Sequence, residues 1–259
     1  MRFKTLFFIF FLVTGSSLSQ AEMIFRAAYE NASQYPYYMG DTSEVLEPKP
    51  GVAVELVKLL ENYIPGFKVE FIRYPWKQCL LLLKEGKLDG IFNGSFSQAR
   101  LAIGSYPWKD GAVDPSRRLT TISYHFYRLK GSKFTWDGHN VSGFTQKIGT
   151  PVAFSIEADL EKMGLPILSA RDIQVNFSNL LRGKVDALAL QDVTGDFHMQ
   201  RKSGLTSIEK VLPPLKTKPY YLMLSRQFKK KHPELSEKIW NTIAILREKK
   251  LQELIQEYY

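Results

Sequence analysis

Gly86-Lys-Leu-Asp-Gly-Ile-Phe-Asn-Gly-Ser-Phe-Ser-Gln-Ala-Arg100 is the stretch of sequence that decides the fold. It follows an apolar helical run, Leu80 to Leu83, and its first residue is a glycine of the kind that ends helices. The apolar piece Leu88 to Phe92 is short enough to be a buried strand. Polar residues follow it directly. Ligands in open α/β sheets bind beyond the carboxyl ends of strands, so we look for a site in the residues after Phe92.

The same unit occurs a second time at residues 180–192, Leu-Leu-Arg-Gly-Lys-Val-Asp-Ala-Leu-Ala-Leu-Gln-Asp. It repeats the order of helix end, Gly-Lys, apolar residue, Asp, apolar strand and polar tip. The first tip ends in Arg100 and the second in Asp192, so two facing units would offer opposite charges across a cleft. The alternative is that Gly-Lys-x-Asp is an ordinary helix-to-strand turn. Two copies with polar tips favour a paired site.

The beginning of the chain has the pattern of an export signal. Arg2 and Lys4 precede an unbroken apolar run, Leu6 to Val13, which is too short to span a bilayer. Ser19-Gln20-Ala21 fits a small-x-small cleavage site. We expect residues 1–21 to be removed and the mature protein to be soluble in the periplasm. An uncleaved membrane anchor is the alternative.

The composition is that of a globular protein, with 44% hydrophobic and 24% charged residues. The one cysteine, Cys79, lies in an apolar helical run and is expected to be a buried thiol. No cluster of Cys and His has zinc spacing, and we expect neither a metal nor a cofactor. The net charge of +9 indicates a solvated basic surface and, in an exported protein, no nucleic-acid partner.

Aromatic residues gather where a small-molecule pocket would need walls. Tyr29 and Tyr37 stand at and after the end of an expected first strand, Met23 to Tyr29. Trp76 stands near the start of the helix that carries Cys79. Each of these rings could equally cover the hydrophobic core, so the sequence leaves both roles open.

Several motifs, taken in order, carry a family resemblance. They are Tyr35-Pro36-Tyr37, Gly51 to Leu56, the Leu83 to Arg100 stretch, Tyr106-Pro107, Gly149-Thr150, the second Gly-Lys-Val-Asp unit, Tyr220 to Ser225, and His232 to Leu235. The chain resembles the bacterial extracellular solute-binding proteins of family 3, the periplasmic receptors of amino-acid ABC transporters. The resemblance covers essentially the whole mature chain.

This resemblance implies an α/β fold of the two-lobed type II periplasmic-binding-protein kind, a monomer that closes on its ligand. Two crossing strands, near Ser123 to Arg128 and Pro213 to Tyr221, would join the lobes. Lobe 1 would comprise residues 22–124 and 217–259, and lobe 2 residues 125–216. The expected partners are a small solute and the permease of an ABC transporter.

The resemblance also implies a ligand clamp. Arg100 matches the arginine that grips a ligand carboxylate, for which its planar two-pronged guanidinium is suited. Asp192 matches the acidic residue that grips the ligand amine, and Ser95 and Ser97 match assisting hydroxyls. Asn93 lies among them at the first tip. Ser155, at the start of an expected helix, would either bind an anion or merely cap that helix.

The sequence departs from the family in two places. The segment from Asp89 to Arg100 is one residue shorter than in typical amino-acid receptors, and Ala153-Phe154 stands where a glycine commonly precedes the anion-binding helix. Arg117 and Arg118 precede the first crossing. If this piece is extended, one of them should face the cleft, and a solvated pair in a loop is the alternative. We expect a binding protein for an amino acid or small carboxylate. A sensory binding domain and a dehydratase on the same fold are the alternatives.

Overall fold

The computed structural model describes residues 22–258, so the expected signal peptide lies outside the described residues. The long strands are β1 (Met23–Glu30), β2 (Phe67–Tyr74), β3 (Gly90–Ser95), β7 (Thr120–Leu129), β10 (Lys147–Pro151), β11 (Ile167–Ala170), β12 (Val185–Gln191) and β14 (Lys216–Ser225). The short strands are β4 (Gly104–Ser105), β5 (Trp108–Lys109), β6 (Ala112–Val113), β8 (Thr135–Trp136), β9 (Val141–Ser142) and β13 (Ile208–Lys210).

The main sheet contains the same arrangement twice. Its strand order is β11-β10-β12-β7-β14-β3-β1-β2. In one half β1 lies between β2 and β3, and in the other β10 lies between β11 and β12, all four pairings being parallel. β7 and β14 pair antiparallel with each other and with their neighbours β12 and β3. Parallel strands place their carboxyl ends at one edge, so each half has one site-forming edge.

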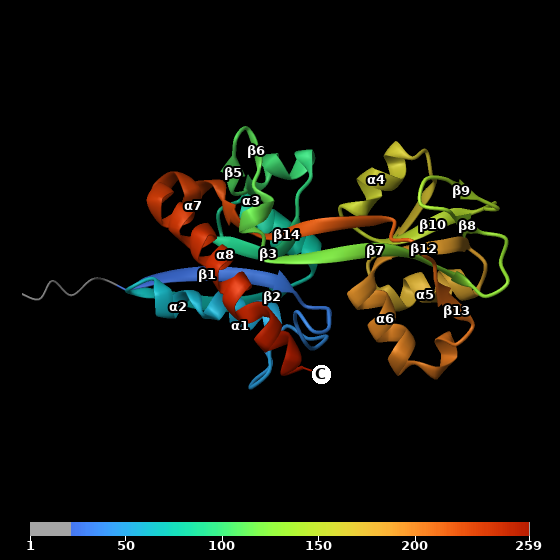
Figure 1. The fold of residues 1–259 in the computed structure, drawn as a ribbon, viewed down its shortest axis with the longest axis horizontal. Coiled ribbons are helices and arrows are strands. Elements are labelled where there is room, and N and C mark those ends of the chain that lie inside the picture. Colours follow the sequence, from blue (N-terminus) through green and yellow to red (C-terminus); the bar gives the residue numbers. More distant parts are fainter. Residues whose placement is uncertain (1–21, 259) are drawn as a thin grey trace, which may run out of the picture.

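Figure 1 shows two lobes joined by the long strands β7 and β14. The first lobe contains β1–β3, the small β4–β6 elements and the helices α1, α2, α3, α7 and α8, and the second contains β8–β13 and α4–α6. Both crossing strands fall where the sequence predicts them. The chain therefore leaves the first lobe through β7 and returns through β14.

Helices cover both lobes. They are α1 (Val52–Lys58), α2 (Leu60–Tyr63), α3 (Trp76–Lys84), α4 (Ile156–Lys162), α5 (Ile173–Leu181), α6 (Asp192–Arg201), α7 (Arg226–Lys231) and α8 (Pro233–Gln256), with 3-10 turns η1 (Gln98–Ala102), η2 (Pro115–Arg117) and η3 (Ser203–Leu205). Across residues 22–258, no helix combines the length and the apolar character needed to cross a membrane.

The repeated Gly-Lys-x-Asp unit has the same structural role in both lobes. Gly86 and Gly183 adopt φ +72° and +66°, a left-handed backbone that favours glycine and ends the helix before each strand. Asp89 accepts a 2.8 Å hydrogen bond from the backbone N–H of Arg26 in β1. Asp186 accepts hydrogen bonds from the backbone N–H groups of Thr145 and Gln146, just before β10. Each aspartate thus ties the turn before one strand to the backbone of its lobe's central strand or of the residues just before it.

The first lobe is closed by the C-terminal helix. Trp240 of α8 is fully buried, and its indole N–H donates a 2.8 Å hydrogen bond to the carbonyl oxygen of Leu222 in β14. Cys79 is buried with a free thiol, as the sequence predicts, and burial raises the pKa of that thiol to about 12. It is therefore a packing residue at neutral pH.

The structure decides two points near the site that the sequence analysis raised. The strand expected at Leu88 to Phe92 runs instead from Gly90 to Ser95, because β3 pairs with β14 as far as Ser95 opposite Tyr220. Arg117 ends the 3-10 turn η2, so the alternation of a strand does not apply there. Its guanidinium pairs with Asp114 and Glu237 on the first lobe.

Candidate ligand-binding site

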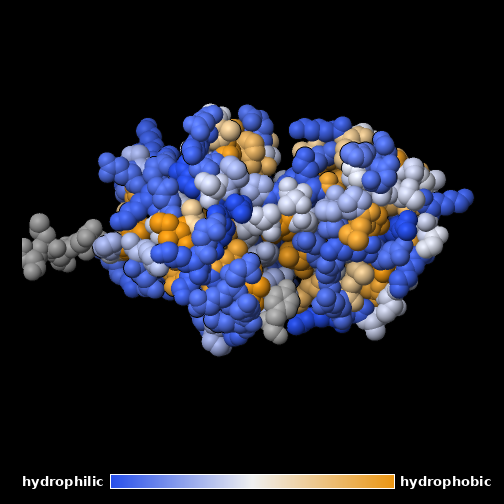
Figure 2. All heavy atoms as spheres, in the orientation of Figure 1, coloured by the Kyte–Doolittle hydropathy of each residue, from blue (hydrophilic) through white to orange (hydrophobic). Residues whose placement is uncertain are grey.

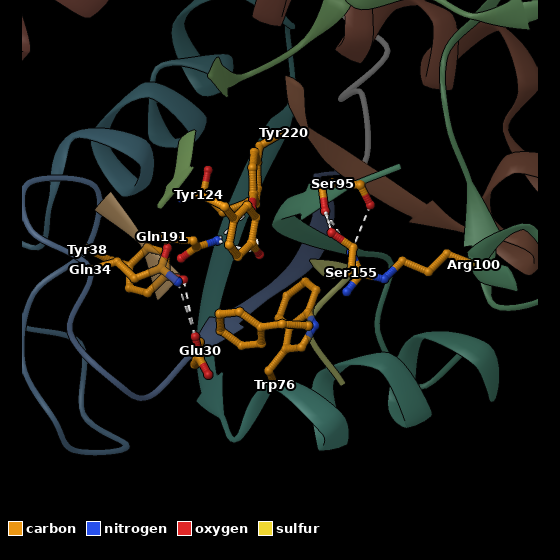
Figure 3. A pocket seen from close by; sticks show the side chains of 12 residues that line it. Glu30, Gln34, Tyr38, Trp76, Ser95, Arg100, Tyr124, Ser155, Gln191 and Tyr220 are labelled. Atoms are coloured by element: carbon orange, nitrogen blue, oxygen red, sulfur yellow. Dashed lines mark hydrogen bonds between the residues drawn. The ribbon is translucent and has the colours of Figure 1, made fainter. Parts of the chain in front are cut away.

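A small cavity lies between the two lobes, where the strand ends of both halves meet. The first lobe contributes the end of β1, the loop after it, the start of α3, β3 and η1. The second lobe contributes the connection between β10 and α4 and the end of β12, and the crossing strands β7 and β14 contribute Tyr124 and Tyr220 (Figure 3). The lining residues are Glu30, Gln34, Tyr38, Trp76, Asn93, Ser95, Arg100, Tyr124, Phe154, Ser155, Gln191 and Tyr220.

Arg100 connects the two lobes. It is 6% exposed, and its guanidinium donates to the carbonyl oxygen of Ser95 at 2.8 Å and to that of Ala153, in the second lobe, at 3.0 Å. Its other face lies over the ring of Trp76, 5.3 Å from the centroid. Among the described residues no carboxylate lies within ion-pair distance of it. A buried cation without a counter-charge is costly, so the position favours an anionic group.

Ser95 and Ser155 meet across the cleft next to Arg100. Their hydroxyl oxygens are 2.6 Å apart. Lys218 of β14, which is 8% exposed, donates to the hydroxyl and carbonyl oxygens of Ser155 at 3.0 and 3.1 Å and pairs with Asp159. Burial is the main cause that lowers the pKa of Lys218. Ser155 does start α4, but its hydroxyl makes no capping hydrogen bond and is used for this contact between lobes.

Glu30 is the acidic group of the cavity. It ends β1, and its carboxylate accepts hydrogen bonds from Gln34 at 3.4 Å and from the hydroxyl of Tyr38 at 3.5 Å. Burial raises the pKa of Glu30 to about 7, although the Tyr38 hydrogen bond and Arg73 oppose the shift. Figure 3 shows Glu30 and Arg100 on opposite sides of the lining residues. The cavity thus has one cationic and one acidic end.

Hydroxyl groups from both crossing strands, together with amide groups from β3, β12 and the loop after β1, line the wall between these ends. The side-chain nitrogen of Gln191 donates to the hydroxyl of Tyr220 at 2.7 Å, and that hydroxyl donates to the hydroxyl of Tyr124 at 3.0 Å. The side-chain oxygens of Gln34 and Gln191 and the amide nitrogen of Asn93 are buried without a hydrogen-bond partner. Unpartnered buried polar atoms are unfavourable, so these atoms are available to a ligand or to water.

The cavity has a volume of about 10 Å³, about enough for one water molecule. Two larger cavities of about 390 and 660 Å³ adjoin it along the seam between the lobes, and Glu30 and Phe154 line all three. In Figure 2 the seam appears as a notch in the outline between the two halves. The structure therefore has a closed centre, and a ligand of amino-acid size requires the lobes to separate.

Five residues expected from the sequence line the cavity, namely Trp76, Asn93, Ser95, Arg100 and Ser155. Tyr29 does not, because its ring is fully buried in the first lobe and stacks on Phe92. The Tyr37 ring is buried beside the crossing strand, with its hydroxyl 3.5 Å from the carbonyl oxygen of Thr121. Ser97 precedes η1 and holds the backbone of Arg100 through its carbonyl oxygen.

Asp192 is also not among the lining residues. β12 ends at Gln191 and α6 begins at Asp192, so Gln191 takes the place in the cavity that we expected for Asp192. The Asp192 carboxylate accepts a 2.8 Å hydrogen bond from the backbone N–H of Val193. Burial is the main cause that raises its pKa, while Lys210 and His125 in the second lobe oppose the shift. The structure does not bring it to Arg100.

Sequence reasoning missed several residues of the site, among them Glu30, Gln34, Gln191, Tyr124 and Tyr220. Glu30 could have been found by the rule that directed the search beyond Phe92, because Glu30 ends the parallel strand β1. Gln191 could have been found in the same way. Tyr124 and Tyr220 lie in crossing strands whose sequence pattern gives no sign of which face meets the cavity.

Comparison with solved structures identifies the fold. A histidine kinase sensor domain with similarity to periplasmic binding proteins has 17% identity and a TM-score of 0.71, the match covering 91% of this chain and 95% of that one. An amino acid ABC transporter substrate-binding protein from Streptococcus pneumoniae, bound to L-arginine, has 17% identity and a TM-score of 0.68, with 91% and 94% covered. The chain has the two-lobed periplasmic-binding-protein fold.

An ancestral amino acid-binding protein described as a precursor of cyclohexadienyl dehydratase also has the periplasmic-binding-protein fold, with 15% identity, a TM-score of 0.66, and 91% and 95% covered. No protein-family model and no curated protein matches the sequence. The predicted two-lobed architecture is confirmed. At these identities the likeness does not extend to the ligand, which has to be argued from the cavity.

Proposed function

We propose that this protein is a periplasmic receptor that clamps a small zwitterionic solute, an amino acid or a close relative, between its lobes. The observation that carries the proposal is Arg100, a buried guanidinium in the cavity between the lobes with no carboxylate partner among the described residues. Arg100 would bind the ligand carboxylate, replacing its bonds to the carbonyl oxygens of Ser95 and Ala153. The solved amino-acid receptor of the same fold supports this ligand class.

The ligand amine requires an acidic partner, and we propose Glu30 in place of Asp192. Glu30 lines the cavity opposite Arg100, with its proton affinity raised by burial. A bound ammonium next to it would favour the ionised carboxylate, so the ligand amine would lie at Glu30 while the ligand carboxylate stays at Arg100. Asn93 and Gln191 have unpartnered polar atoms for the remaining ligand groups.

The proposal includes transport and location. The charged, apolar and small-residue order of residues 1–21 supports cleavage after Ala21 and a periplasmic mature protein. Lobe 1 would comprise residues 22–124 and 217–259 and lobe 2 residues 125–216, with an ABC permease as partner. Mass spectrometry of the exported protein is expected to find Glu22 at the N-terminus, and an intact Met1 on a membrane-bound species would contradict export as proposed.

A test of the function is a ligand screen on purified mature protein. Thermal unfolding with each of the common amino acids at millimolar concentration should raise the melting temperature for at least one of them, because a ligand that binds only the folded state stabilises it. Calorimetric titration of that ligand with the parent and with Arg100→Ala then tests the site. No shift with any amino acid would contradict the proposal.

Two alternatives remain open, each with a similar fold among solved structures. A sensor domain would bind the same class of ligand but pass the signal to a kinase instead of a permease. Deletion of the gene should abolish uptake of the ligand for a transport receptor and should leave uptake unchanged for a sensor. A dehydratase would consume its ligand, so unchanged ligand by nuclear magnetic resonance after long incubation is expected for a binding protein.

A further inference from the structure

A second cavity, which we call the side cavity, adjoins the central one and has a volume of about 390 Å³. The two share Glu30, Gln34, Phe154 and Gln191 in their linings, so they adjoin at these residues. The first lobe contributes residues 30–34 and Asp41 to the side cavity. The second lobe contributes the start of α5 and part of α6. A volume of this size lies in the range of small-molecule sites.

The charged groups of the side cavity are mostly acidic. Its lining contains three carboxylates, those of Glu30, Asp41 and Asp172, against one guanidinium, that of Arg171. Within residues 22–258 none of the three carboxylates belongs to an ion pair. His198 also lines the cavity, and burial lowers its pKa, so it adds no positive charge at neutral pH. The side cavity therefore attracts cations.

Buried atoms in this lining also lack hydrogen-bond partners. The side-chain oxygens of Gln34 and Gln191, residues that are both 3% exposed, have none. The hydroxyl of Thr194, a residue that is 8% exposed, has none either. An amide oxygen can only accept a hydrogen bond, so two of these atoms require a donor. The side cavity therefore combines hydrogen-bond acceptors that lack donors with carboxylates that belong to no ion pair. A positively charged group with several N–H donors would satisfy both.

We propose that the ligand extends from Arg100 past Glu30 into the side cavity, and that its distal end carries a cationic, donor-rich group such as an ammonium or a guanidinium. This inference rests on the proposed function, since Arg100 holds the other end of the ligand. A distal carboxylate would instead face the like charges of Asp41 and Asp172, and a distal alkyl group would leave the acceptors of Gln34, Gln191 and Thr194 unpartnered.

The test compares L-arginine with L-citrulline, which has the same length but a neutral end group. Calorimetric titration of the mature protein should show that L-arginine binds at least about tenfold more tightly than L-citrulline. A charge-assisted hydrogen bond accounts for a difference of about this size. L-glutamate should bind more weakly than both. Equal affinity for L-arginine and L-citrulline would overturn the inference.

Variants locate the effect in the side cavity. The double variant Asp41→Asn/Asp172→Asn keeps the oxygen acceptors that each carboxylate offers to the backbone N–H groups of Ser33 and Gln174, so the fold should be retained. The preference for L-arginine should fall to about twofold or less. Asp110→Asn, on the exposed turn between β5 and β6, is the matched control and should leave the preference unchanged. An unchanged preference in the double variant would also overturn the inference.

Failure of this inference can be told apart from failure of the proposed function. One outcome is that L-citrulline and other neutral amino acids bind, that Arg100→Ala abolishes this binding, and that L-arginine binds no more tightly. That outcome would support the receptor function and refute the proposed role of the side cavity. If no amino acid binds the parent protein, the receptor function and the role of the side cavity are both refuted.

Discussion

At the scale of single residues, the candidate site depends on where two charges lie. Arg100 is buried between the lobes and is held by carbonyl oxygens of both, with Trp76 under its guanidinium. Glu30 lies across the cavity at the end of β1. A solute without charged groups would leave the buried guanidinium of Arg100 without a counter-charge. A zwitterion supplies a carboxylate that balances this charge.

Truncation of Arg100 tests the cationic end. Arg100→Ala would leave the ligand carboxylate without its partner, and losing one member of a buried charged pair costs about 2–5 kcal/mol, roughly 30- to several-thousand-fold in affinity. Arg100→Lys should also lose affinity, because an ammonium cannot make the two-pronged contact. Calorimetric titration with the ligand found in the screen measures both. Parent-like affinity of Arg100→Ala would make Arg100 a structural link between lobes.

The pH dependence tests Glu30. Its pKa is about 7 in the folded protein against an ordinary value of 4.5, so between these values the folded state holds a proton that the unfolded state releases. The contribution of this group to the free energy of unfolding is therefore full below pH 4.5 and is lost as the pH rises through about 7. Denaturant titration at pH 5 and pH 8 should show that loss in the parent and less of it in Glu30→Gln. Equal pH dependence in both would contradict the raised pKa.

At the scale of elements, the second lobe depends on close packing of α6 against β7. Gly195 of α6 faces the ring of Tyr127, and a Cβ atom on it would lie 2.2 Å from the ring carbon Cζ. Tyr127 is fully buried, and its hydroxyl donates a 2.8 Å hydrogen bond to Asp196, so the ring has no room to move away. The glycine is therefore required by contact between elements and not by backbone conformation.

Gly195→Ala should destabilise the protein by about 1–3 kcal/mol, the usual cost of overpacking, even though alanine is the better helix former. Gly204→Ala is a suitable control, since an added Cβ there meets no atom within 4 Å. Thermal unfolding of both variants measures the difference. A Gly195→Ala variant as stable as the parent would mean that α6 can shift away from β7 without loss.

At the scale of the whole molecule, the two lobes are in contact through Ser95 with Ser155 and through Arg100 with the backbone of Ala153. These contacts leave a central cavity of about 10 Å³. A solute of amino-acid size can enter only if they break. The described structure thus corresponds to the closed arrangement of the proposed clamp, in which the pair β7 and β14 would be the hinge.

Small-angle scattering tests closure. Ligand-free protein should have a larger radius of gyration than the closed structure, and saturating ligand should reduce it, because only the closed form makes both sets of contacts. Arg100→Ala at the same ligand concentration is the control and should stay extended. An unchanged radius for the parent at saturation would argue against a clamp.

The sequence by itself determined the elements and their order. Apolar periodicity, the helix-ending glycines Gly86 and Gly183, and the repeated Gly-Lys-x-Asp unit are local signals, and local physical chemistry decides where helices and strands begin and end. The search beyond the strand end pointed to Arg100, and the family resemblance pointed to Ser155 at the start of α4. Even the buried thiol of Cys79 followed from its apolar helical neighbours.

Only the tertiary structure decided which side chains share the cavity. Gln191 lines it and the adjacent Asp192 does not, because one step from β12 into α6 turns the next side chain to another face. Glu30 and Arg100 belong to one cavity because β1 and β3 are paired although 63 residues separate Arg26 from Asp89. Such contacts depend on register and lobe closure, which involve residues distant in the chain and leave no local pattern to read.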